Sequence, residues 1–258
     1  MQRIKTLSEY FKKYELSEKD PEKFWSEIAD SFIWKKKWDN VLESDFENAD
    51  FKWFKNAQLN ITENIFERNL SERGDKTAII WEPNDPKESP IYLSYKELYK
   101  QTCTFSNALR SKGIKKGDRV IIYMPMVPEA IVAMLACARI GAIHSVVFGG
   151  FAANELAVRL SDAAPKVIVT STCGIEVGKI IEYMPIVNEA VEISDKKPTS
   201  VVVLERPQAS FTPVANRDVT WSDLMASAQP IDCVPVSATH PLYILYTSGT
   251  TGKPKGVV

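Results

Sequence analysis

A loop rich in glycine and hydroxyl groups at residues 247–256 has the composition of a site that holds a chain of phosphates. Its glycines permit positive φ angles and close backbone approach, so successive amide N–H groups can form a concave anion site. Threonine and serine hydroxyls add hydrogen-bond donors, and two lysines add positive charge on flexible side chains. We call residues 247–256 the phosphate loop, and its candidate polyphosphate-binding residues are Thr247, Ser248, Gly249, Thr250, Thr251, Gly252, Lys253, Lys255 and Gly256.

The phosphate loop differs from the Walker A loop. Two residues separate Gly249 from Gly252 and Lys253, whereas Walker A requires four residues before its Gly-Lys pair. Pro254 also opposes direct entry into a helix at this point. We expect a buried strand at 242–246 to lead into the loop and a second strand to leave it at 255–258. A polar hairpin loop without a ligand has the same composition and remains an alternative.

Strands and helices alternate from residue 76 onward, which indicates parallel βαβ units. The expected fold class is therefore α/β, with a doubly wound, mostly parallel sheet flanked by helices. Ligands of such sheets bind beyond the carboxyl ends of the strands, and Gly149-Gly150 follows one of them. We predict strands at 77–81, 91–93, 119–123, 142–148, 166–170 and 201–204, and helices at 95–112 (after a capping box at 94–97), 128–139, 154–162, 180–193 and 221–226.

The first 73 residues form a helical, aromatic-rich segment, and residues 74–258 form a second domain. Asp20 caps a helix that has Pro21 at its first position, and residues 60–63 have the spacing of another capping box. Trp34, Trp38 and Trp53 invite a role as a ligand-stacking platform. Packing of this segment against the next domain is the favoured interpretation, because large aromatic side chains usually serve packing.

Composition restricts the function classes. Of 258 residues, 25% are charged and the net charge is −1, which gives nucleic-acid binding no electrostatic support. The first thirty residues do not have a signal-peptide pattern, and the longest apolar run, 130–138, is too short to span a membrane. We expect a cytoplasmic protein in which the cysteines are reduced and mostly buried; these are Cys103, Cys137, Cys173 and Cys233. We expect no metal site, and no catalytic role for His144 or His240.

The phosphate loop resembles the signature of the adenylate-forming (acyl-CoA synthetase) superfamily. Residues 117–125, 133–142 and 145–151 are similar to early segments of the same enzymes, and the Trp-rich region resembles the leading segment of acetyl-CoA synthetases. Residues 173–179 and 232–236 look more like the propionyl-CoA synthetase branch. The resemblance covers nearly the whole chain, and it implies an adenylate-forming large domain of which residues 74–258 are the first part.

This resemblance implies a two-step reaction. A short carboxylate, acetate or propionate, attacks the α-phosphorus of ATP, and coenzyme A then displaces AMP from the acyl-adenylate. The phosphate loop would hold the β- and γ-phosphates with Mg²⁺, and Lys253 and Thr250 would act as the catalytic residues. The resemblance implies that coenzyme A contacts Phe148, Gly149, Gly150, Glu176, Val177, Gly178 and Lys179. In acetyl-CoA synthetases, arginines occupy the positions of Glu176 and Lys179.

The resemblance also implies that the adenine, ribose and acyl pockets of such enzymes lie outside these 258 residues. We therefore expect the chain alone to be inactive in acyl-adenylate formation, because catalysis requires its groups to be held together. A nicotinamide-dependent oxidoreductase is an alternative, although the chain has no Gly-x-Gly-x-x-Gly motif. A non-catalytic folded fragment is a further alternative.

Overall fold

The computed structural model describes residues 4–85, 87–176, 178–247, 252 and 254–258. The chain divides into two compact units, each described separately below. Unit 1 consists of Met1–Arg68 with Pro235–His240, and unit 2 consists of Asn69–Val234 with Pro241–Val258. The domain boundary at residue 73 stays a prediction.

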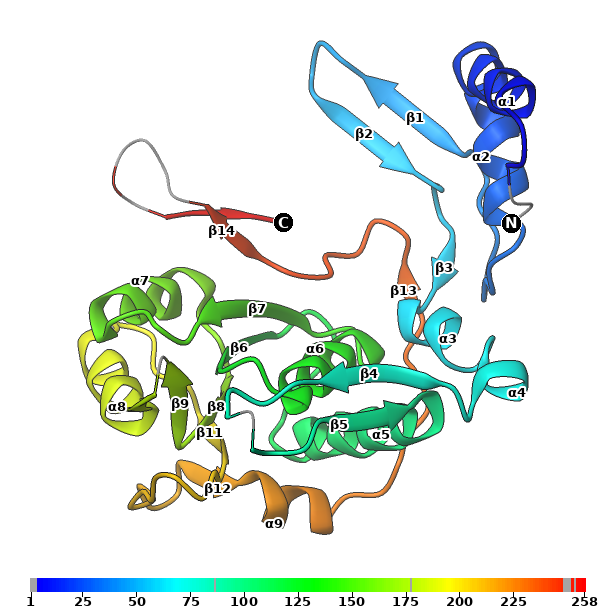
Figure 1. The fold of residues 1–258 in the computed structure, drawn as a ribbon. Coiled ribbons are helices and arrows are strands. Elements are labelled where there is room, and N and C mark those ends of the chain that lie inside the picture. Colours follow the sequence, from blue (N-terminus) through cyan, green and yellow to red (C-terminus); the bar gives the residue numbers. More distant parts are fainter. Residues whose placement is uncertain (1–3, 86, 177, 248–251, 253) are drawn as a thin grey trace. The chain divides into compact units, whose positions relative to one another are not determined.

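A five-stranded parallel sheet forms the centre of unit 2 (Figure 1), with the strand order β12-β11-β8-β6-β7. Helix α6 follows β6 on one face, where it contacts α5, whereas α8 follows β8 on the other face, where it contacts α7. This confirms the doubly wound α/β fold. The strands are β6 (Arg119–Met124), β7 (Ile143–Phe148), β8 (Val167–Ser171), β11 (Ser200–Leu204) and β12 (Asp218–Thr220); the helices are α4 (Leu70–Arg73), α5 (Tyr95–Ser111), α6 (Pro128–Arg139), α7 (Ala153–Ala163), α8 (Tyr183–Ile193) and α9 (Trp221–Ala226).

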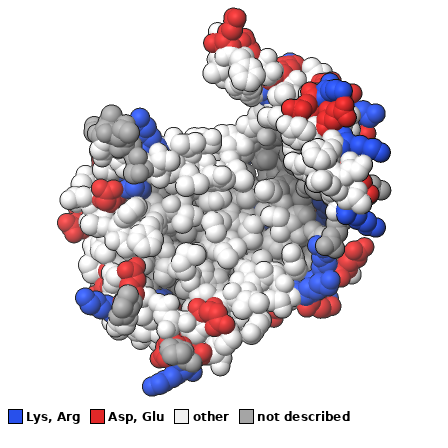
Figure 2. All heavy atoms as spheres, turned by 45° about the horizontal axis from the view of Figure 1, so that its top comes forward, with Lys and Arg blue, Asp and Glu red and all other residues white. Residues whose placement is uncertain are grey.

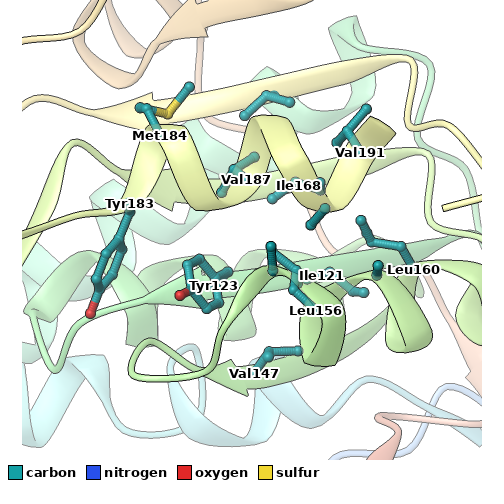
Figure 3. Packing of buried hydrophobic residues seen from close by; sticks show 14 of the residues in the cluster. Ile121, Tyr123, Val147, Leu156, Leu160, Ile168, Tyr183, Met184, Val187 and Val191 are labelled. Atoms are coloured by element: carbon teal, nitrogen blue, oxygen red, sulfur yellow. The ribbon is translucent and has the colours of Figure 1, made fainter. Parts of the chain in front are cut away.

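One hydrophobic core cluster of unit 2 lies between the sheet and helices α7 and α8 (Figure 3). Side chains alternate along a strand, so β6 contributes Ile121 and Tyr123 to this cluster. Leu156 and Leu160 of α7 fill the space beneath them, and both are fully buried. Because this layer is closely packed, it holds the ends of β6 and β7 in fixed positions.

The predicted helix boundaries of unit 2 follow from local hydrogen bonds. Ser94 and Glu97 form a complete capping box at the start of α5, as the sequence indicated. Pro128 occupies the first turn of α6, where its missing N–H group costs nothing. Helix α9 has the predicted bounds, and the Thr220 side chain accepts from the Asp223 N–H group. These helix starts could be predicted from the sequence because each depends only on residues within one helical turn.

Three two-stranded antiparallel hairpins accompany the sheet: β4 (Thr77–Trp81) with β5 (Ile91–Ser94), β9 (Cys173–Glu176) with β10 (Lys179–Glu182), and β14 (Leu245–Thr247) with β15 (Lys255–Val257). The two strands of the first pair were predicted, at 77–81 and 91–93. The helix predicted at 180–193 is present as α8, but its predicted start was wrong. Residues 179–182 pair with β9 across Gly178, whose φ is +78°, and the helix begins at Tyr183. The buried strand predicted at 242–246 was also wrong, because β14 begins at Leu245, which is 56% exposed.

Unit 1 holds helices α1 (Leu7–Lys19), α2 (Pro21–Ala29) and α3 (Ile61–Ile65), together with β1 (Leu42–Asp45), β2 (Asp50–Trp53), β3 (Gln58–Leu59) and β13 (Val236–Ser237). The predicted cap at Asp20 is present, and its side chain accepts from the Lys23 N–H group. The segment that was predicted to be helical also contains the short strands β1, β2 and β3. Asp45 accepts from the N–H groups of Glu47 and Asn48 and so stabilises a turn between β1 and β2.

The tryptophans of unit 1 contact other aromatic rings of the same unit. Trp34 lies edge-on to Trp38, with ring centroids 5.1 Å apart, and both contact Phe54. Trp53 lies edge-on to Trp25 at 5.8 Å. These contacts account for the Trp-rich segment as an aromatic cluster and require no ligand.

Two further observations concern the chain as described. Among the described residues, no helix is long and apolar enough to cross a membrane. Cys103, Cys137 and Cys173 are buried and Cys233 is half-buried, as expected from the wide spacing of the cysteines.

Candidate functional site

A cavity of about 990 Å³ opens in unit 2 at the carboxyl ends of β6 and β7. Strands β6 and β8 are neighbours whose following helices lie on opposite faces, so this edge of the sheet is a topological switch point, where α/β proteins bind ligands. The lining residues are Trp81, Asn84, Asp85, Glu88, Met124, Pro125, Met126, Val127, Met134, His144, Val146, Val147, Phe148, Gly149, Ile175, Glu176, Gly178, Ile180, Tyr183, Arg206, Gln208, Tyr243, Ile244 and Leu245.

The walls of this cavity are mainly apolar, and its charged groups are few. In Figure 2, uncharged residues cover the middle of the visible face of unit 2. Asp85, Glu88 and Glu176 contribute carboxylates to the lining, and Arg206 contributes a guanidinium group. This lining suits a ligand with a long apolar portion better than a compact anion.

Tyr183 determines the shape of the loop that follows β7. A Cβ atom on Gly149 would lie 2.1 Å from the Tyr183 hydroxyl oxygen, and one on Gly174 would lie 2.3 Å from it. Both positions therefore require glycine to admit this ring. The Tyr123 hydroxyl supports the same loop, since it donates to the carbonyl oxygens of Gly149 and Phe151 at 2.9 and 2.7 Å. Gly149 thus has a packing role, whichever ligand the loop contacts.

Two tyrosines below this loop stay protonated at physiological pH. Burial raises the pKa of Tyr183 to about 12, and the nearby Glu176 carboxylate adds to this effect. Burial likewise raises the pKa of Tyr123 well above its ordinary value. The rings of the two residues are 4.9 Å apart. Their hydroxyls therefore serve as neutral hydrogen-bonding groups rather than as charged ones.

His144 lies on β7 and lines the cavity, with 9% of its surface exposed. Its Nδ1 atom is buried and has no hydrogen-bond partner among the described residues. Burial lowers the pKa of His144 from 6.5 to about 4, so the imidazole is neutral at pH 7.

The β9–β10 hairpin carries the second group of residues implied to contact coenzyme A. Glu176 and Lys179 are direct partners across the hairpin. Glu176 and Gly178 line the cavity, and Gly178 has the positive φ that the tight turn requires. Val177 lies outside the described residues. Among the seven predicted residues, the structure therefore brings four together around the cavity: Phe148, Gly149, Glu176 and Gly178.

The remaining two described residues of that set, Gly150 and Lys179, lie beside the lining without belonging to it. Gly150 follows Gly149 in the loop after β7, and a Cβ atom there would lie 2.4 Å from the Phe148 ring. Lys179 is the exposed first residue of β10. Phe148 itself is 61% exposed at the end of β7, so its ring is available to a ligand.

The phosphate loop connects β14 to β15. Thr247 pairs with Lys255 across the two strands, and Tyr246 pairs with Gly256. Gly252 has a φ of +80°, a conformation that favours glycine. Both Thr247 and Lys255 are exposed. The other predicted members of the loop, Ser248, Gly249, Thr250, Thr251 and Lys253, lie outside the described residues.

Helix α7 contacts both predicted ligand loops through one side chain. The Arg159 guanidinium lies 4.7 Å from the ring centroid of Phe151, which ends the loop after β7. The same group lies 5.4 Å from the ring centroid of Tyr246, which begins the stem of the phosphate loop. Glu155 accepts a hydrogen bond from Arg159 at 2.9 Å and holds the guanidinium between the two rings. The two loops, far apart in the sequence, therefore lie against the same helix.

Sequence reasoning did not find the residues that position these loops. Tyr183 and Gly149 are separated by 34 positions, but nothing local to either indicates that they meet. Arg159 and Asp162 look like ordinary polar residues of an amphipathic helix. The sequence shows only that residue 149 is glycine; that this glycine lacks a positive φ and is needed for close approach by another side chain is visible in the structure alone.

Comparison with known proteins identifies the family. The AMP-binding enzyme family model matches residues 66–258, and the model of the acetyl-coenzyme A synthetase N-terminus matches residues 10–65. The chain belongs to the AMP-binding enzyme family. The AMP-binding family match does not favour the oxidoreductase alternative, and it covers both the cavity and the phosphate loop.

Relatives in the AMP-binding family include named acyl-CoA synthetases. The chain is 47% identical to the mitochondrial acyl-CoA synthetase short-chain family member 3 of Rattus norvegicus over 97% of the chain and 37% of the relative. It is 48% identical to the acetyl-coenzyme A synthetase of Syntrophobacter fumaroxidans, over 96% and 38% respectively. A solved structure of acetoacetyl-CoA synthetase from Streptomyces lividans superposes with a TM-score of 0.85 at 27% identity, covering 95% of the chain and 37% of that structure. The chain thus spans little more than a third of the length of these proteins.

Proposed function

We propose that this chain supplies the phosphate-holding and CoA-contacting parts of an AMP-forming acid–CoA ligase. In this proposal the substrates are MgATP, coenzyme A and a short carboxylate, either acetate or propionate. The observation that carries the proposal is the position of Arg159, whose guanidinium contacts Phe151 and Tyr246 together. Both predicted nucleotide-contacting loops thereby share one rigid helix. Such an arrangement suits two successive reactions at one centre.

The phosphate loop would stabilise charge on the departing pyrophosphate. Its backbone N–H groups and hydroxyls would donate to the β- and γ-phosphate oxygens, and Lys253 and Thr250 would act at the reacting end. Thr247, Gly252 and Lys255 are described near the stem, and the exposure of Thr247 and Lys255 is compatible with contact to a ligand. Preorganised donors of this kind accelerate a reaction because they need no rearrangement as charge develops.

Magnesium would enter as the MgATP complex. No group of three or more histidine, cysteine, aspartate or glutamate side chains that could hold a metal ion occurs among the described residues. This observation fits a cation that is coordinated mainly by the phosphates of the substrate and by water. When bound, the ion neutralises charge on the phosphates, and the hydroxyls and lysines of the loop orient the same groups.

The cavity would receive part of coenzyme A. Its apolar wall around Phe148, Val146 and Ile180 fits a flexible pantetheine chain. Glu176 stands where acetyl-CoA synthetases have an arginine, so this position repels a phosphate. Lys179 and Arg206 are then the cations of this region that remain to contact the CoA phosphates.

The cellular location and the activity of the isolated chain are also proposals. We retain a cytoplasmic location, whereas the rat relative carries the word mitochondrial in its name. We further propose that a polypeptide of only these 258 residues does not form acyl-adenylate, because it spans 37% of that relative. Carboxylate-dependent exchange between ATP and pyrophosphate, measured with the purified chain, would disprove the latter proposal.

Ligand-dependent thermal stabilisation tests the proposed function. The chain is titrated separately with magnesium pyrophosphate, MgATP, coenzyme A and NAD. We expect pyrophosphate, MgATP and coenzyme A to raise the melting temperature and NAD to leave it unchanged. Lys253→Ala should abolish the pyrophosphate effect. Lys115→Ala is the matched control, because it removes an equal charge just before β6, at the amino-terminal edge of the sheet. Stabilisation by NAD alone, or by none of the ligands, would contradict the proposal.

A further inference from the structure

A side-chain hydrogen bond between described residues attaches the stem of the phosphate loop to α7. The Tyr246 hydroxyl donates to the Asp162 Oδ2 atom at 2.6 Å, across 84 positions of sequence. Arg159, one turn earlier on the same helix, lies over the Tyr246 ring. Gly256 lies opposite Tyr246 in β15, and a Cβ atom on it would lie 3.2 Å from the Tyr246 ring and 3.6 Å from Asp162 Oδ2. The Tyr246 side chain and Gly256 thus fit closely against α7.

Within the described part of the chain, other contacts give the stem little support. Strands β14 and β15 contain three residues each, and such an isolated two-stranded hairpin is marginal in water. Leu245 and Val257 are 56% and 55% exposed, so they bury little apolar surface. Just before β14, the Ile244 N–H group donates to the His144 carbonyl and the Ser145 hydroxyl donates to the Ile244 carbonyl, both at 2.9 Å. These bonds fix the entry to the hairpin but not its direction beyond residue 244.

We propose that Asp162 is a positioning residue for the phosphate loop, acting through the Tyr246 hydroxyl. This inference rests on the proposed function, because it assigns the α7 contact to the site that holds the ATP phosphates. The hydrogen bond fixes the hairpin before the ligand arrives, so binding does not have to order the stem. Arg159, which is paired with Glu155, places its guanidinium beside the same ring.

Conservative variants separate the hydrogen bond from the charge. Tyr246→Phe keeps the ring and its contact with Arg159 but removes the donor. Asp162→Ala removes the acceptor and the charge, and Asp162→Asn keeps an acceptor while removing only the charge. We expect Tyr246→Phe and Asp162→Ala each to weaken magnesium pyrophosphate binding about tenfold, as for a lost charge-assisted hydrogen bond. We expect Asp162→Asn to stay within about threefold of the original chain. The double variant Tyr246→Phe with Asp162→Ala should be no weaker than the weaker single variant.

The experiment has two arms. Isothermal titration of the 258-residue chain with magnesium pyrophosphate gives the affinity, and hydrogen exchange without ligand gives the protection of the β14 and β15 amides. We expect faster exchange at the hairpin in Tyr246→Phe, with unchanged exchange in β6 and β8. Tyr92→Phe is the matched control, because Tyr92 is an exposed residue of β5, and it should leave both measurements unchanged.

The two arms distinguish the failure of each proposal. If the original chain shows no pyrophosphate binding, the proposed function fails. Unchanged hairpin exchange in Tyr246→Phe would overturn the anchoring role of the hydrogen bond, with or without ligand binding. Unchanged affinity in Tyr246→Phe, or additive losses in the double variant, would overturn the positioning role of Asp162. Equal acceleration of exchange across the whole sheet would also overturn it, because that result indicates general destabilisation.

Discussion

Protonation of His144 should destabilise unit 2 in mildly acidic solution. The pKa of this residue falls from 6.5 to about 4 because burial disfavours the charged form. A lowered folded-state pKa means that the unfolded chain binds the proton first as the pH falls. The stability contribution of His144 is therefore fully present above pH 6.5 and is lost as the pH falls from 6.5 through 4.

The two pKa values give the size of the effect. For a single site with these values, the linkage relation gives a loss of about 2 kcal/mol in the free energy of unfolding between pH 7 and pH 5. The side chain is 9% exposed, so solvent screening reduces this figure little. The buried, unpartnered Nδ1 atom adds a reason, since an imidazolium would carry an unsatisfied N–H group there. Asp85, Glu88 and Glu176 line the same cavity, but burial alone accounts for the shift in the His144 pKa.

Urea unfolding of the chain at pH 7, 6 and 5, followed by hydrogen exchange in β6 and β8, measures this effect within unit 2. The His144→Gln variant should lose most of the pH dependence in this range. His240→Gln is the matched control, because His240 belongs to unit 1, and this variant should keep the original profile of the sheet. Parallel pH profiles of the original chain and His144→Gln would refute the reasoning.

Three other predictions concern packing, capping and thiol reactivity. Gly149→Ala should lower the free energy of unfolding, measured in urea, by about 1–3 kcal/mol, because the new Cβ would lie 2.1 Å from the Tyr183 hydroxyl oxygen. Adding Tyr183→Phe should restore part of this loss. If the effects of the two substitutions on the free energy of unfolding are simply additive, the contact is disproved. Ser94→Ala should cost about 1 kcal/mol in the same assay through the loss of the α5 capping box, and an unchanged midpoint would contradict it. Burial raises the pKa of the Cys137 thiol to about 12, so this residue should react slowly with iodoacetamide at pH 8. Mass spectrometry should show that half-buried Cys233 is labelled before Cys137, and equal labelling rates would contradict this order.

Local patterns were sufficient to predict most of the parallel sheet and its helices. The start of α5 depends on Ser94 and Glu97, and the start of α6 depends on Pro128, so each could be recognised within one helical turn. Errors occurred where pairing with a distant segment decided the structure. Residues 180–181 are both isoleucine, which suits a helix or a strand equally, and the strand formed because β9 offers a partner.

The residues of the candidate site could be predicted from the sequence, but the helix that holds the phosphate loop in place could not. The phosphate loop was recognisable from its glycines, hydroxyls and lysines, because those residue types adjoin one another in the sequence. The helix that supports it was not recognisable, since Asp162 precedes Tyr246 by 84 positions and no local pattern connects them. The burial of the strand before the loop was overestimated for a related reason. Apolar residues at 242–245 resemble a core strand, although Leu245 lies largely in solvent.

The most direct test of the central claim is the location of bound pyrophosphate on the chain. Backbone amide resonances of ¹⁵N-labelled protein are recorded while magnesium pyrophosphate is added. Our account predicts that the largest shifts occur at residues 247–256, including the described Thr247, Gly252 and Lys255. Saturable shifts confined to other parts of unit 2, with the amides of residues 247–256 unmoved, would contradict it.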